Sequence, residues 1–120
     1  MNILLDTHIL LWSIQDSPKV PHQIRKAMIN ADRIFVSVAS LWECAIKISS
    51  KKLEIDFEKL IKAIEESGYE ILPIKPSHLS KLIELPPHHK DPFDRLLVAQ
   101  SMAEPLRLQS HDDMVLHYLQ

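Results

Sequence analysis

Six carboxylates occupy positions where a folded chain could gather them around a metal ion. Each lies near the end of a predicted strand or in the first turns of a predicted helix: Asp6, Glu43, Asp91, Asp94, Asp112 and Asp113. Carboxylates that share one site repel one another and raise one another's pKa unless a cation neutralises them. Oxygen ligands suit Mg²⁺ or Mn²⁺ better than zinc. Such an ion lowers the pKa of a bound water and stabilises charge on a phosphate, so these residues indicate metal-assisted phosphodiester hydrolysis.

Each of these acids also has an ordinary structural explanation. Glu43 could pair with Lys47 one helical turn later, a contact that contributes ~0.2 to 0.5 kcal/mol on an exposed face. Capping a helix N-terminus, or complementing the dipole there, could explain Asp6, Asp91, Asp94, Asp112 and Asp113. For Asp91, which directly precedes Pro92, capping is the preferred interpretation. The functional assignment therefore depends on how the acids are positioned together.

Strands and helices alternate along the chain. Short apolar segments predict strands at 2–5, 33–37, 70–74 and 106–110, and helical patterns cover 21–31, 37–52, 56–68, 77–85 and 91–105. This alternation implies right-handed crossovers and an α/β fold with a mainly parallel sheet flanked by helices. In such a sheet, functional groups collect just beyond the carboxyl ends of the strands. Asp6, Ser110 and Asp112 follow strands in this way.

Composition narrows the function classes. The chain has 120 residues, of which 46% are hydrophobic and 25% charged, and we predict a single domain over 1–120. No segment is apolar enough to span a bilayer and none reads as a secretory signal, so we expect a soluble, cytoplasmic protein with no membrane partner. The single cysteine, Cys44, rules out a zinc site built from paired cysteines, and the single glycine, Gly68, rules out glycine-rich phosphate loops. A net charge of -2 does not by itself indicate a nucleic-acid partner.

The histidines give a weaker signal. His88 and His89 are adjacent in an irregular loop and lack the i,i+4 spacing of a helical zinc pair, so we interpret them as polar loop residues with phosphate contact as a second role. His8 and His111 lie next to candidate acids in sequence, where they could support the site. A serine hydrolase is disfavoured because the chain has no G-x-S-x-G elbow.

Four segments resemble, in order and spacing, the motifs of the PIN domain, and most closely those of VapC-type toxins of bacterial toxin-antitoxin pairs. They are LLDTHILLW at 4–12, SVASLWECAIK at 37–47, LPPHHKDPFDRLLVAQS at 85–101 and LQSHDD at 108–113. The resemblance implies an α/β/α sandwich and a metal-dependent endoribonuclease. Its acidic quartet, binding Mg²⁺ or Mn²⁺, would be Asp6, Glu43, Asp94 and Asp112. The serine at Ser110 replaces a more usual threonine, and Asp113 stays open as an alternative fourth acid.

The same resemblance implies partners: an RNA substrate, a cognate antitoxin that can present a basic residue to the acids, and a second copy in a homodimer. Single-stranded RNA loops are the expected target. We expect Ser110 and Thr7 to orient a ligand or water. The residues expected to meet flanking phosphates are His88, His89, Lys90 and Arg95.

Two other functions stay open. A non-catalytic PIN-like module would bind RNA or protein without cleavage, although the presence of all four acids argues against it. A metal-dependent phosphatase for small substrates would hydrolyse a phosphate monoester under the same metal conditions.

Overall fold

The computed structural model describes residues 1–119, and these form four strands and seven helices. The strands are β1 (Asn2–Leu5), β2 (Arg33–Ser37), β3 (Glu70–Leu72) and β4 (Arg107–Gln109). The helices are α1 (Thr7–Ile14), α2 (His22–Asn30), α3 (Val38–Ser49), α4 (Phe57–Glu66), α5 (Pro76–Glu84), α6 (Pro92–Ala103) and α7 (Asp113–Tyr118). None of the helices in this range is long and apolar enough to cross a membrane.

The four strands form one parallel sheet in the order β3-β2-β1-β4. Leu5 of β1 pairs with Val36 of β2 on one side and Gln109 of β4 on the other, so the carboxyl ends of these strands meet at one edge. The predicted α/β fold is confirmed. The strand predicted at 70–74 ends at Leu72, because Pro73 has no backbone N–H to give to a neighbour.

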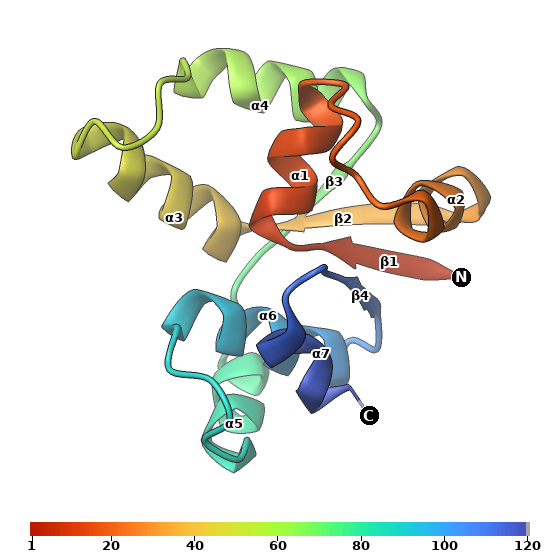
Figure 1. Ribbon diagram of the computed structural model, residues 1–120. Helices are drawn as coiled ribbons and strands as arrows, with labels where there is room; N and C mark the ends of the chain where they lie inside the picture. Colours follow the sequence, from red (N-terminus) through yellow and green to blue (C-terminus); the bar gives the residue numbers. More distant parts are fainter. Residues whose placement is uncertain (120) are drawn as a thin grey trace.

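Helices cover both faces of the sheet, as Figure 1 shows with α1 to α4 on one side and α5 to α7 on the other. Side chains alternate along β1: Ile3 and Leu5 pack in a core with Leu60 of α4, whereas Leu4 packs in a second core with Leu97 of α6. The implied three-layer α/β/α sandwich is therefore confirmed.

Helix α1 lies outside the helical ranges predicted from the sequence. It begins one residue after the end of β1, and its residues Ile9 and Leu10 are buried. Helix α1 is apolar on several sides, so an amphipathic period does not separate it from the apolar strand before it. The boundary is set by Asp6, whose carboxylate accepts a hydrogen bond from the backbone N–H of Ile9.

A buried polar network fixes α6 against β2 and α5. The Ser37 hydroxyl donates to Oε1 of Gln100 (2.5 Å), and Nε2 of Gln100 lies 3.3 Å from Nδ1 of His78. His78 is fully buried, and its Nε2 lies 2.5 Å from Oε2 of Glu104. Because a buried polar group without a partner is costly, this network favours one placement of α6.

Candidate metal centre and active site

The candidate site lies beyond the carboxyl ends of β1 and β4, where three helices begin. Asp6 follows β1 and caps α1, and Asp112 follows β4 and caps α7, its carboxylate accepting from the N–H of Met114. Asp94 lies in the first turn of α6. The parallel pairing of β1 with β4 therefore brings together acids from opposite ends of the sequence.

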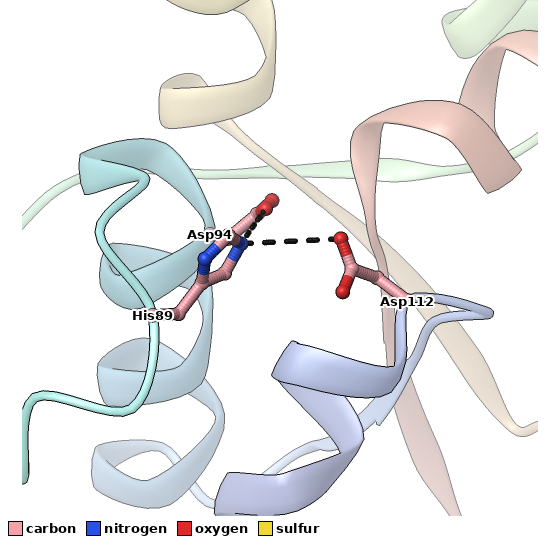
Figure 2. A group of neighbouring side chains, drawn as sticks. All are labelled: His89, Asp94 and Asp112. Atoms are coloured by element: carbon pink, nitrogen blue, oxygen red, sulfur yellow. Dashed lines mark hydrogen bonds and ion pairs between the residues drawn. The ribbon is translucent and has the colours of Figure 1, made fainter.

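His89, Asp94 and Asp112 form the tightest group of potential metal ligands. Nε2 of His89 lies 2.8 Å from Oδ2 of Asp94 and 3.9 Å from Oδ2 of Asp112. Figure 2 shows the imidazole of His89, which comes from the loop before α6, directed at both carboxylates. One potential ligand atom of each residue lies within 4.8 Å of those of the other two. Within residues 1–119, no other group of three histidines, cysteines or acids meets that distance. Carboxylate oxygens and an imidazole nitrogen are suitable donors for a divalent ion such as Mn²⁺.

Electrostatics around Asp94 support a cation at this position. The pKa of the Asp94 carboxyl is raised to about 6, chiefly by burial. The negative charges of Asp91 and Glu43 act in the same direction, whereas the hydrogen bond and charge interaction with His89 act against it. A divalent cation would offset both the burial and the repulsion. The residues present therefore fit a metal ion.

Asp6 is linked to this group through Ser110. It is 3% exposed, and burial raises the pKa of its carboxyl, while the Ser110 hydroxyl and the N–H of Ile9 act in the opposite direction by hydrogen bonding. The Ser110 oxygen also accepts from the N–H of Asp112 (3.0 Å). Ser110 therefore connects the two acids that follow β1 and β4.

Glu43 is fixed at both of its oxygens. Oε1 accepts from the Thr7 hydroxyl (2.7 Å), and Oε2 lies 3.0 Å from Nζ of Lys47. The pairing with Lys47 considered from the sequence is thus present, but Glu43 is 8% exposed, so the pair is not on an open surface. Thr7 therefore orients Glu43. Its expected role in orienting a ligand or water stays a prediction.

The other acids are placed as follows. Asp91 caps α6, accepting from the N–H groups of Phe93 (2.9 Å) and Asp94 (3.0 Å), so the preferred capping interpretation is confirmed. Asp113 is exposed in the first turn of α7, and it is Asp112, not Asp113, that joins the group with His89.

The residues expected to meet phosphates lie along the loop before α6 and at its start. The ring of His88 lies against His117 (4.4 Å between centroids) and Tyr118 (5.0 Å) of α7, and Lys90 is exposed. Arg95 is directed at the same loop: its Nη2 donates to the carbonyl of Leu85 (3.4 Å), and its buried Nε has no hydrogen-bond partner within residues 1–119. Arg95 thus holds the loop that carries His89, and phosphate contact by these residues stays a prediction.

Comparison with known proteins identifies the family. The model of the PIN domain family matches residues 3–118. The chain belongs to the PIN domain family. This confirms the resemblance inferred from the four sequence motifs.

Solved structures show the same PIN domain fold. The crystal structure of VapBC2 from Rickettsia felis bound to a DNA fragment from their promoter is 19% identical, with a TM-score of 0.64, over 93% of this chain and 88% of that chain. The crystal structure of FitAcB from Neisseria gonorrhoeae is 15% identical, with a TM-score of 0.67, over 98% of this chain and 92% of that chain. A search of curated proteins gives no significant match.

Proposed function

We propose that this PIN domain is a metal-dependent endoribonuclease and acts as the toxin of a toxin-antitoxin pair. The observation that carries the proposal is the group of His89, Asp94 and Asp112, assembled at the strand ends with two further fixed acids, Asp6 and Glu43, around it. A divalent ion bound there, Mg²⁺ or Mn²⁺, would lower the pKa of a bound water and offset the charge of the RNA phosphate.

The chain's own residues hold these groups in place. Ser110 orients Asp6 and Asp112, Thr7 orients Glu43, and His89 lies against Asp94. Fixed orientation reduces the reorganisation needed when an ion and a phosphate bind. We assign the catalytic and metal-binding roles to Asp6, Glu43, Asp94 and Asp112, and we add His89 as a candidate nitrogen ligand.

The proposed partners follow from the family resemblance, from the two similar structures and from the acidity of the site. The similar structures are VapBC2 bound to a DNA fragment from their promoter and FitAcB, and we propose a cognate antitoxin for this protein. The proposed homodimer rests on the resemblance of the four sequence motifs to VapC-type toxins. An antitoxin arginine or lysine would compete with the metal for the carboxylates. A bacterial toxin of this kind would act on RNA in the cytoplasm.

Cleavage of total bacterial RNA by the purified protein tests the proposal, with Mn²⁺ or with a chelator. Asp112→Asn and Asp113→Asn are matched variants, because the two acids are adjacent and both lie at the start of α7. We expect Asp112→Asn to abolish metal-dependent cleavage and Asp113→Asn to retain it. The reverse pattern would reassign the fourth acid to Asp113.

The same assay separates the alternatives. A non-catalytic module would bind RNA with metal present yet leave it intact, and a small-substrate phosphatase would hydrolyse a phosphate monoester and spare RNA. Equal cleavage by the wild type and by Asp6→Asn would attribute the activity to a contaminant and contradict the proposed function.

A further inference from the structure

Three aromatic side chains lie together next to the acids but take no part in holding them. His8 and Trp12 come from α1, and His111 comes from the loop between β4 and α7. The centroid distances are 4.8 Å from Trp12 to His111, 5.6 Å from His8 to His111 and 5.8 Å from His8 to Trp12. We call His8, Trp12 and His111 the ring cluster.

The ring cluster adjoins the candidate active site. His8 lies two residues after Asp6, and His111 directly precedes Asp112. Both imidazoles lie close enough to Asp6 to lower the pKa of its carboxyl electrostatically. A strand of RNA with one phosphate at the acids would therefore pass close to these rings.

Packing inside the core does not account for the ring cluster. His8 and His111 are exposed, and only Trp12 is half-buried, packing against the core beside α1. None of the three side chains makes a hydrogen bond with another of the described residues 1–119. His111 also lines an open hollow of about 630 Å³ between α2, β4 and α7.

A cation accompanies the rings. Nζ of Lys19 lies 6.0 Å from the centroid of Trp12, and Lys19 is exposed. Among the salt bridges within residues 1–119, none includes Lys19. Aromatic faces beside a free cation are the combination that binds single-stranded nucleic acid, where bases stack on rings and phosphates meet positive charge.

We propose that the ring cluster is a stacking site for an unpaired nucleobase of the RNA strand whose phosphate lies at the acids, with Lys19 facing a neighbouring phosphate. This inference rests on the proposed ribonuclease function and assigns it a substrate-binding surface. The ligand class is a base in single-stranded RNA, because a base inside a duplex is stacked on both faces by its neighbours and has no free face to offer to a ring.

Equilibrium binding tests the stacking site in the Asp94→Asn background, in which RNA should stay intact. The probes are a labelled single-stranded RNA and an oligonucleotide of the same length and charge with abasic positions. We expect Trp12→Leu and His111→Ala each to weaken binding of the RNA by about 5- to 100-fold, the effect of removing a stacking side chain. Affinity for the abasic oligonucleotide should stay unchanged, because the phosphates are the same.

Ile83→Ala is the control, since Ile83 is 85% exposed on α5, a helix that carries none of the candidate site residues. It should leave both affinities unchanged. The chain has two tryptophans, so Trp42→Phe leaves Trp12 as the single reporter, and its fluorescence should be quenched by the RNA and not by the abasic probe. His111→Ala, on an exposed loop, keeps the test valid if Trp12→Leu fails to fold.

Equal losses of affinity for both probes would overturn the stacking site. Unchanged RNA affinity in both variants would also overturn it, and would indicate that the ring cluster binds a protein partner instead. Wild-type cleavage in Mn²⁺ is scored in parallel. A protein that binds RNA through the ring cluster but does not cleave it would contradict the proposed function and leave the stacking site supported. If Asp94→Asn still degrades the probe, the assignment of Asp94 fails instead.

Discussion

The carboxyl of Asp94 has a pKa of about 6, so it titrates close to neutral pH. The cause is burial, added to by the charges of Asp91 and Glu43 and opposed by His89. A carboxyl with its ordinary value of 3.8 would be fully ionised at neutral pH, whereas Asp94 without a metal is still partly protonated just above pH 6.

The contribution of Asp94 to the stability of the metal-free protein should therefore fall as the pH rises. The folded state holds the Asp94 proton more tightly than the unfolded chain, so this contribution is complete below the ordinary pKa of 3.8 and is lost as the pH rises through about 6. We expect the melting temperature of the wild type, with chelator present, to fall over this range relative to that of Asp94→Asn.

Asp6 contributes in the same direction, because burial also raises its pKa, and this contribution is retained in Asp94→Asn. The exposed Asp113→Asn is the control and should follow the wild type. Identical pH profiles for all three proteins would contradict the raised pKa of Asp94.

His89 is the second residue whose substitution is informative. As a nitrogen donor beside two carboxylates, it should favour Mn²⁺ over Mg²⁺, which prefers oxygen ligands. We expect His89→Ala to weaken Mn²⁺ binding by ~10- to 100-fold, the usual effect of losing a residue in or next to the coordination shell, and to weaken Mg²⁺ binding less. Isothermal titration calorimetry measures both affinities.

His88→Ala is the control for this measurement, because the His88 ring lies against α7 and is absent from the group of ligands. Unchanged Mn²⁺ affinity in His89→Ala would remove His89 from the candidate ligands.

At the scale of elements, the caps of the helices decide where the acids are placed. Asp91 accepts from two N–H groups at the start of α6, and one of them belongs to Asp94 itself. Asp56 caps α4 in a similar way, accepting from the N–H of Lys59 (3.1 Å). Helix α4 carries none of the candidate site residues. The two caps are a matched pair, one at the site and one away from it.

Replacing either cap with alanine should cost about 1 kcal/mol in the free energy of unfolding, measured by urea denaturation. Asp91→Ala should also reduce RNA cleavage, because the first turn of α6 positions Asp94. Asp56→Ala should retain wild-type cleavage. Equal cleavage by both variants would show that the cap of α6 serves stability alone.

Local sequence pattern predicts most of the helices and strands, but not all of them. Apolar spacing, Pro and Gly positions and capping residues predict the helices and strands between 21 and 110, because these signals act over a few residues. Helix α1 was not predicted, because its apolar residues continue those of β1 without a change of period. Asp6 could be recognised as a cap from the sequence, but its additional place beside Ser110 could not.

For the whole molecule, the buried network through Gln100 connects the layer of α5 and α6 to the sheet. Gln100 is fully buried, and its amide meets Ser37 on β2 and His78 on α5. Since α6 carries Asp94, this network fixes one acid relative to those that follow β1 and β4.

We expect Gln100→Leu to lower the free energy of unfolding by ~1 to 3 kcal/mol, because it leaves the Ser37 and His78 groups buried without this partner. Ser37→Ala should also destabilise the protein, as Ser37 both donates to Gln100 and caps α3. The double variant should cost less than the sum of the two single changes, which chemical denaturation of all four proteins would measure. Strict additivity would show that the contact does not couple the layers.

The sequence by itself determined the alternation of strands and helices, the parallel sheet and the position of acids directly after strands, because these follow from the pattern of neighbouring residues. Only the tertiary structure decided which strand lies beside which, and with it the meeting of Asp6 and Asp112 beyond β1 and β4. The same holds for the contact of His89 with Asp94 and for the ring cluster. His8 and Trp12 share a helical spacing, but His111 lies about a hundred residues further along the chain, and His89 reaches Asp112 from a separate loop. These meetings depend on how β4 and α7 pack beside β1, which no local pattern contains.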